Sequence, residues 1–264
     1  MRIKKATPEK HKRSWQNIFR AFGRAHKKAS VQFEDSAPLL RHLDELRKRV
    51  FKAFLAVIIA TGVSFSFSQQ LIAYLAGPVG GLKSLVSIEL TENIASFMKV
   101  SLLGGFVLAM PVIVYQIMAF ILPGLKRNER KWFLFVVPFA TLLFAGGVAF
   151  TWFVMLPTAI PFLVDFMGIT TQVRPNNYFD FITRMMFWIG MCFEMPLVVM
   201  LLTKFQFVNA RQLLSGWRYA IVTIAIVAAV VTPTVDPISM GLFMAPLAGL
   251  YLISIILSAI VGRG

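Results

Sequence analysis

Cysteine and histidine are nearly absent from this chain of 264 residues. The single cysteine, Cys192, lies in an apolar stretch, so the sequence supports no disulfide, no zinc site and no thiol nucleophile. The three histidines are too scattered to form a metal cluster. There is also no Gly-rich phosphate loop, no HExxH helix and no credible catalytic triad. We therefore expect a protein that is not an enzyme and that uses neither a metal nor a cofactor.

Acidic residues are scarce as well. The chain has 12 Asp and Glu against 27 Lys and Arg, which gives a formal net charge of +15. Hydrophobic residues, by contrast, make up 57% of the chain, whereas a soluble domain is about 45–50% apolar. A soluble fold must also keep a polar surface, so this excess cannot be hidden in one soluble core. The composition predicts a membrane protein.

The N-terminal segment has no apolar run. Residues 1–30 hold ten of the lysines and arginines and a single acid, Glu9, so they do not form a cleavable signal peptide. We predict a basic, disordered cytoplasmic arm over residues 1–35, attracted to anionic membrane lipid rather than to nucleic acid. An organelle transit peptide is the alternative, although such peptides are usually Ser-rich and this arm has only Ser14 and Ser30.

Six apolar stretches are candidates to cross a membrane, which takes about 20 mostly apolar residues per helix. They cover residues 50–69, 100–123, 132–156, 179–203, 217–231 and 238–261, and the fifth is short. With the N-terminus inside, the inner segments carry 23 of the 27 Lys and Arg. The outer segments carry only Lys83, Lys99, Arg174 and Arg184. The positive-inside rule therefore predicts an all-α, six-span membrane domain over residues 36–264 with both termini in the cytoplasm.

Small and kinking residues recur inside these spans. Proline removes a backbone hydrogen bond and bends a helix, so four of them favour a kinked, concave bundle, although each alone also fits an ordinary packing kink. They are Pro111, Pro138, Pro196 and Pro246. The glycine pairs 104–105 and 146–147 lie in apolar segments, where small residues allow helices to approach closely.

Residues 36–51 predict an amphipathic helix at the cytoplasmic interface. Its apolar stripe is Leu39, Leu43, Leu46 and Val50, at helical spacing. Glu45 lies in this helix, either as a local partner of Lys48 or Arg49 or as part of a binding site.

Glu129 is the only acid in the inner loop PGLKRNERK, residues 123–131. It forms either a local salt bridge or, with Glu45, a pair of carboxylates on one membrane face. Two carboxylates on a basic background suit a ligand with two guanidinium groups, because Arg–carboxylate pairing is planar and bidentate.

Two further acids lie at other depths. Glu194 falls well inside the fourth span, where an ionisable group needs a partner or water, so it is expected to face the bundle interior. It is either a protonated group bonded to a neighbouring helix or a functional group. Asp236 lies in the outer turn TPTVDP, where a helix-capping role is the simpler interpretation.

Five segments, in this order, together resemble the TatC family, the polytopic receptor subunit of the twin-arginine protein translocase. They are HLDELRKR (42–49), TENIASFMKVSLLGG (91–105), PVIVYQIMAFILPGLKRNERK (111–131), FEMP (193–196) and TPTVDP (232–237). The resemblance covers residues from about 36 to 260.

This resemblance implies a receptor that binds twin-arginine signal peptides of folded precursors at the cytoplasmic face of the plasma (inner) membrane. Partners would be single-span TatA/TatB-type subunits, other copies of the chain and membrane lipid, and the proton motive force would drive transport. The signal site and its support would include Glu45, Arg47, Pro111, Phe120 and Glu129. The family's intramembrane glutamate matches Glu194, and the outer turn with Asp236 lies where partner subunits dock.

The sequence departs from the family at one place, since Leu252 follows Tyr251 where the family often has an acid. A different class of function also fits part of the pattern. A secondary transporter or channel could use Glu194 as an ion or proton site, but we find no internal repeat of the kind that such transporters favour.

Overall fold

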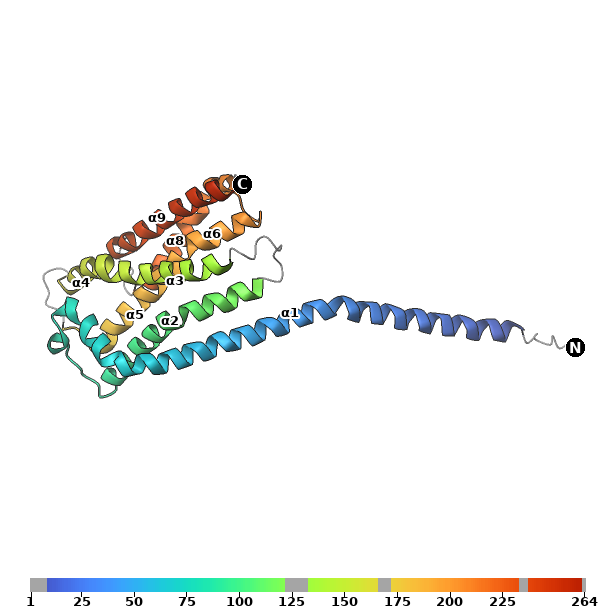
Figure 1. Ribbon diagram of the computed structural model, residues 1–264, viewed down its shortest axis with the longest axis horizontal. Coiled ribbons are helices and arrows are strands. Elements are labelled where there is room, and N and C mark those ends of the chain that lie inside the picture. Colours follow the sequence, from blue (N-terminus) through green and yellow to red (C-terminus); the bar gives the residue numbers. More distant parts are fainter. Residues whose placement is uncertain (1–8, 122–132, 166–171, 233–236, 263–264) are drawn as a thin grey trace, which may run out of the picture. The chain divides into compact units, whose positions relative to one another are not determined.

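The computed structural model is built of helices (Figure 1). It describes the backbone of residues 9–121, 133–165, 172–232 and 237–262, and the side chains of residues 42–121, 135–165, 172–232 and 240–262. Within these ranges there is no β-strand, in agreement with the predicted all-α class. The chain divides into two compact units, an N-terminal unit, Met1–Phe51, and a bundle unit, Lys52–Gly264.

Helix α1 runs over Glu9–Leu75 and so belongs to both units. The predicted amphipathic helix over residues 36–51 and the first predicted span are therefore parts of one continuous helix. Its stripe residues Leu43, Leu46 and Val50 are exposed, and the place of this helix at a membrane interface stays a prediction. The separate basic arm over residues 1–35 stays a prediction.

The rest of the bundle unit consists of short 3₁₀ turns and longer α-helices. The turns are η1 (Gly77–Val79) and η2 (Leu82–Ser84), in the long segment between the first two predicted spans. The helices are α2 (Glu92–Ile121), α3 (Phe133–Phe150), α4 (Leu156–Val164), α5 (Pro175–Phe193), α6 (Met195–Lys204), α7 (Ala210–Ser215), α8 (Trp217–Val231) and α9 (Pro237–Val261).

Five helical segments of the described chain are long and apolar enough to cross a membrane. They are His42–Val79, Glu92–Ile121, Phe135–Val164, Pro175–Lys204 and Met240–Val261, and each overlaps one predicted span. Helix α8 is apolar but has only 15 residues, or roughly 22 Å of helix against a hydrocarbon core of about 30 Å. The fifth predicted span, the count of six and the side on which the termini lie therefore stay predictions.

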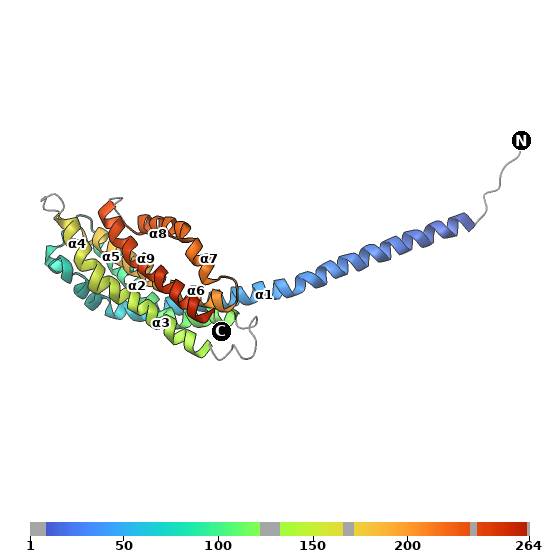
Figure 2. The same cartoon turned by 90° about the horizontal axis from the view of Figure 1, so that it is seen from above.

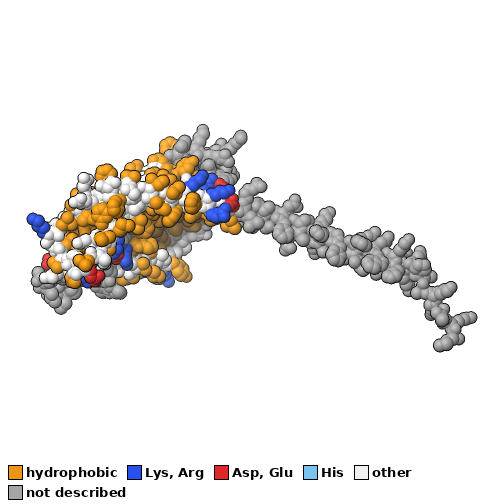
Figure 3. Space-filling model, turned by 90° about the horizontal axis from the view of Figure 1, so that it is seen from below, with side chains coloured by type: hydrophobic (Ala, Val, Ile, Leu, Met, Phe, Trp, Pro, Cys, Tyr) orange, Lys and Arg blue, Asp and Glu red, His pale blue; other side chains and the backbone are white. Residues whose placement is uncertain are grey.

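The surface of the bundle unit is largely apolar, as a lipid environment requires (Figure 3). Large hydrophobic side chains are exposed on several helices, among them Phe135, Leu142, Phe153 and Ile260. In Figure 3 the charged side chains gather in a few places, and orange hydrophobic side chains cover much of the face between them.

Helices α2, α3 and α5 pack against one another in the centre of the bundle unit. Glycines allow two close contacts between helices, one between α2 and α1 and one between α3 and α5. A Cβ atom on Gly105 would lie 2.5 Å from the Thr61 Cα atom of α1, and one on Gly147 of α3 would lie 2.8 Å from the Gly190 Cα atom of α5. Gly104 also meets Ser64, whereas Gly146 has open space around it. Three of the four glycines predicted to lie at close helix contacts therefore do so.

Helix α9 supports the C-terminal half of the unit. It packs against α6, α7 and α8, which Figure 2 shows beside it. The Oγ atoms of Thr203 on α6 and Ser258 on α9 lie 2.7 Å apart, and the Tyr251 hydroxyl on α9 donates to the Leu213 carbonyl of α7 at 2.6 Å. Tyr251 therefore attaches α7 to α9 by a hydrogen bond, even though the next residue, Leu252, is not an acid.

The predicted proline positions divide into two groups. Pro111, Pro138 and Pro246 lie inside α2, α3 and α9. Pro196 lies just after the interruption between α5 and α6, so here the span is broken. A π-helical turn, Thr151–Met155, joins α3 to α4 and adds a second irregularity to the third span. The predicted concave form of the bundle stays a prediction.

Candidate functional site

Glu45 lies on the part of α1 that belongs to the N-terminal unit and makes a local ion pair. Nε and Nη2 of Arg49 donate to Glu45 Oε1 at 3.1 and 2.5 Å, one helical turn away. The Glu45 side chain is 35% exposed and the Arg49 side chain is 25% exposed. Neither bond uses the second carboxylate oxygen, Oε2. The local pairing considered from the sequence is therefore present, and it leaves an acceptor for a ligand.

The neighbouring charges on this helix are more exposed. Asp44 binds Arg47 Nη2 and Lys48 Nζ, each at 2.7 Å. The Arg47 side chain is 80% exposed, so its guanidinium is accessible. Within residues 42–51, Glu45 is thus the more shielded of two acids in a mainly basic helix, and Arg47 lies two residues beyond it.

Glu194 lies where α5 ends and α6 begins. It is the last residue before α6, and Pro196 lies in the first turn of that helix. The residue is only 9% exposed, so it faces the interior of the bundle unit rather than lipid. Its Oε1 atom is buried and accepts no hydrogen bond from the described residues. A carboxyl group in this state is costly to bury, which makes it a candidate for interaction with a donor from outside the chain.

The other predicted site residues are distributed over the chain. Pro111 is exposed in the middle of α2, and Phe120 is half-buried near the end of the same helix. Glu129 and Asp236 lie outside the described residues, so their predicted roles stay predictions. The bundle unit therefore supplies positions for Pro111, Phe120 and Glu194, and the N-terminal unit supplies Glu45 and Arg47.

A second group of charges occupies the cap end of the bundle unit, by which we mean the end where α2 and α5 begin and α4 and α8 end. Glu92, the first residue of α2, is 2% exposed and binds Nε and Nη2 of Arg174. Its other oxygen accepts bonds from the Ile88 amide and the Ser87 hydroxyl. Arg174 also reaches Glu89 at 2.8 Å. Hydrogen bonds to Glu89 and Glu92 raise the pKa of Arg174, so its guanidinium keeps its charge.

About two helical turns further along, a second ion-pair group joins α2 to α5. Lys99 Nζ lies 2.8 Å from Asp180 Oδ1 and donates to Asn176 Oδ1 at 2.9 Å. The other oxygen of Asp180 binds Arg184 Nη2 at 2.8 Å. In addition, the buried Tyr178 hydroxyl donates to the Leu75 carbonyl at 2.8 Å, which attaches the end of α1 to α5. The start of α5 is thus fastened to α1, to α2 and to the segment that precedes α2.

Sequence reasoning missed this arrangement. It treated Lys99, Arg174 and Arg184 only as outer basic residues. The Glu92 carboxylate binds Arg174 and the residues that precede α2. The sequence did contain a signal for these ion pairs. The predicted topology places the starts of the second and fourth spans on the same side of the membrane, and both starts contain acids and bases.

Comparison with known proteins assigns the chain to a family. The family model described as Sec-independent protein translocase protein (TatC) matches residues 41–246. This chain belongs to the TatC family. It is 36% identical over 234 residues to the Sec-independent protein translocase protein TatC of Deinococcus radiodurans, covering 85% of this chain and 87% of that protein. The chloroplastic TATC protein of Arabidopsis thaliana is 38% identical over 230 residues, covering 86% and 67% respectively.

Solved structures agree with this membership. A crystal structure of the twin arginine translocase receptor TatC matches with a TM-score of 0.74 and 33% identity, covering 84% of this chain and all of that one. A second, of the same receptor in DDM, matches with a TM-score of 0.76 and 32% identity, covering 82% of this chain and 99% of that one. The chain is thus a multi-span membrane component of the Sec-independent protein translocase, a protein transport system whose members work with Tat-system partners.

Proposed function

We propose that this TatC-family chain is the receptor subunit that binds twin-arginine signal peptides of folded precursors. Binding takes place at the cytoplasmic face of the plasma membrane, where both termini lie. TatA/TatB-type single-span subunits and further copies of the chain act with it, and the proton motive force drives transport. Membership of the TatC family carries this proposal, since the matched residues 41–246 include each proposed site residue.

The Glu45 carboxylate supports the peptide-binding role. It is partly shielded, so a bond to a peptide guanidinium is weakened less by water than one to an open surface acid. Arg49 already holds it through Oε1, which fixes the position of the carboxylate and leaves Oε2 as an acceptor. We propose that one arginine of the signal peptide binds here and that Glu129 binds the other, with Arg47, Pro111 and Phe120 supporting the site.

Glu194 has a separate role in this proposal. It is buried at the break between α5 and α6, and Oε1 accepts no bond within the described residues. It therefore acts after peptide binding, as an acceptor inside the membrane for a polar group of a partner or a moving segment. Asp236, the residue before α9, belongs to the surface on which partner subunits dock.

The test is crosslinking of a twin-arginine signal peptide, and of its Lys-Lys variant, to purified membranes that contain the full chain. In the unaltered protein the Lys-Lys peptide should crosslink far less than the Arg-Arg peptide. Glu45→Ala and Glu129→Ala should each lower crosslinking of the Arg-Arg peptide by about tenfold, since a charge-assisted hydrogen bond contributes roughly 1.5–3 kcal/mol.

Asp44→Ala is the matched control. Asp44 is an acid on the same helix, adjacent to Glu45, but its carboxylate is held by Arg47 and Lys48 and is more exposed. It should lower crosslinking much less than Glu45→Ala does. The receptor proposal is wrong if peptide binding ignores both Glu45→Ala and Glu129→Ala. Glu194→Ala should reduce transport while sparing peptide binding, and a loss of binding equal to that of Glu129→Ala would contradict the division of roles.

The second hypothesis is a secondary transporter or channel with Glu194 as an ion or proton site. One observation favours it, namely the buried carboxyl group with an unbonded oxygen. It makes a different prediction, because ion flux across vesicles should then depend on Glu194 in the absence of any precursor. A flux that is the same with and without the protein eliminates this alternative.

A further inference from the structure

A cavity at the cap end of the bundle unit is lined by none of the residues of the predicted signal site. It has a volume of about 390 Å³ and is bounded by the end of α4, the first three turns of α5 and the last residue of α8, Val231. Its lining combines two kinds of surface. The apolar part includes Ile160, Leu163, Phe181 and Val231, and the polar part includes the Asp180 carboxylate as well as Arg174 and Arg184.

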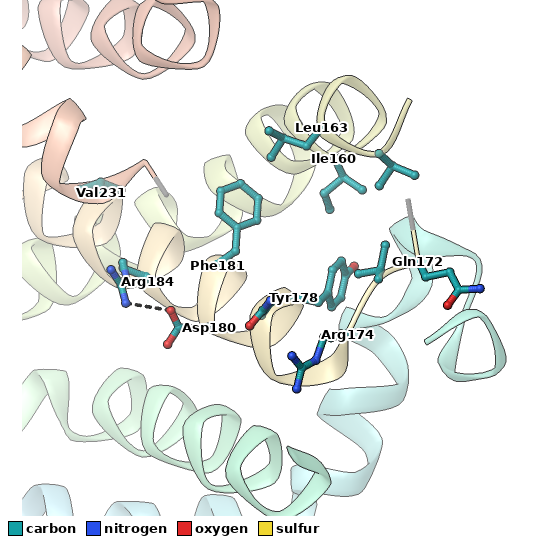
Figure 4. A pocket seen from close by; sticks show the side chains of 12 residues that line it. Ile160, Leu163, Gln172, Arg174, Tyr178, Asp180, Phe181, Arg184 and Val231 are labelled. Atoms are coloured by element: carbon teal, nitrogen blue, oxygen red, sulfur yellow. Dashed lines mark hydrogen bonds and ion pairs between the residues drawn. The ribbon is translucent and has the colours of Figure 1, made fainter. Parts of the chain in front are cut away.

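Figure 4 shows how these side chains lie. Phe181 projects from α5 toward Ile160 and Leu163 on α4, so the three form one apolar wall region. Arg184 lies on the neighbouring turn of α5 and is joined to Asp180 by an ion pair. The cavity is therefore amphipathic, with a hydrocarbon-like part between the helices and charged groups along α5.

Arg184 retains capacity to bind an anion. Its bond to Asp180 uses one of the five N–H donors of the guanidinium, and the side chain is 48% exposed. Asp180 is shared, because its other oxygen binds Lys99 from outside the cavity. The two cations around this one carboxylate leave an excess positive charge where Arg184 meets the cavity. Arg174, in contrast, is held by Glu89 and Glu92.

The position of the cavity narrows the class of ligand. Helices α4 and α8 both end beside it, at Val164 and Val231, and both are apolar. Ends of apolar helices mark the boundary between the hydrocarbon core and the headgroup layer of a membrane. At this depth an anion that also carries hydrocarbon is a phospholipid.

We propose that this cavity is a binding site for an anionic glycerophospholipid, whose phosphate binds Arg184 and whose acyl chain lies against Leu163 and Phe181. A free phosphate shares the headgroup chemistry but would gain nothing from the apolar wall. The proposal does not depend on the signal-peptide site, since none of the residues assigned to that site lines the cavity.

The test is native mass spectrometry of the full-length, delipidated protein titrated with phosphatidylglycerol, phosphatidylcholine or inorganic phosphate. Phosphatidylglycerol should be retained best and inorganic phosphate least. Arg184→Gln removes the charge and should lower phosphatidylglycerol retention about tenfold, as expected for a charge-assisted contact. Leu163→Trp fills the apolar part, leaves every ion pair in place and should lower retention by a similar factor.

Arg211→Gln is the matched control, because it removes the same charge from an exposed position on α7 away from the cavity. It should retain phosphatidylglycerol as the unaltered protein does. Equal retention by Arg184→Gln and Leu163→Trp would overturn the proposal. Retention of inorganic phosphate equal to that of the lipid, or displacement of the lipid by a signal peptide, would also overturn it. If Arg184→Gln fails to fold, as shown by its thermal transition, Leu163→Trp decides the question alone.

Discussion

Arg174, the residue before α5, binds Glu92, the first residue of α2, although 82 positions separate them in the chain. The Glu92 carboxylate is almost completely buried and receives bonds from Arg174, Ser87 and the Ile88 amide. A buried charge of this kind is tolerated because its partners satisfy both oxygens. The two residues therefore hold the segment before α2 against the start of α5.

The first prediction concerns this pair. Arg174→Gln should lower the apparent melting temperature of the detergent-solubilised protein by several degrees, because it leaves Glu92 buried without its charge partner. Glu92→Gln should have an effect of similar size. The double variant should cost less than the sum of the two single changes, since both remove the same interaction.

Glu89→Gln is the control for this measurement. Glu89 also binds Arg174, but its side chain is 66% exposed, so its removal should change the melting temperature little. Additive effects of Arg174→Gln and Glu92→Gln in a thermal-melting series would show that the two residues act independently.

The second prediction compares two adjacent glycines of α3. Gly147→Ala should destabilise the protein by about 1–3 kcal/mol, because the new methyl group would overlap Gly190 and Phe193 of α5. Gly146→Ala should be neutral or slightly stabilising, because nothing lies within 4 Å of that position and alanine favours helix. Unfolding curves of the two variants decide this, and equal stability of the two would contradict the close contact between α3 and α5.

The third prediction separates stability from transport at Glu194. Glu194→Leu should raise the stability by about 1–3 kcal/mol, because it removes a buried polar group that lacks a complete set of hydrogen bonds. The same variant should reduce transport of a twin-arginine precursor several-fold. Thermal melting and transport into vesicles are the two measurements. Lower stability of Glu194→Leu would mean that the carboxyl group has a structural partner and is retained for that reason.

Hydropathy predicted most of the fold, because the requirement for about 20 apolar residues leaves few choices of span. All five helical segments that meet this requirement in the described chain overlap predicted spans. The predicted ends of the spans were less accurate. Helix α2 begins at Glu92 rather than near residue 100, because the Glu92 carboxylate is neutralised by Arg174 and so can lie at the start of an apolar helix.

The sites were harder to predict, because they depend on which charges meet. A helical repeat predicts that Glu45 and Arg49 are neighbours, and they do form an ion pair. No local pattern predicts that Arg174 binds Glu92 or that Asp180 is shared by Lys99 and Arg184. Such contacts follow only from the packing of α2 on α5. Glu194 was predicted only in part. Its burial could be expected from its depth in the span, but its unbonded oxygen could not.

The contact between Gly147 and Gly190 has an evolutionary consequence. A Cβ atom on Gly147 would meet the backbone of α5, and one on Gly190 would meet the Phe144 ring of α3. A larger residue at either site therefore becomes acceptable only after a compensating change on the opposite helix, such as a smaller residue in place of Phe144. Mutations at these positions should show sign epistasis, so that lineages change them together or keep both.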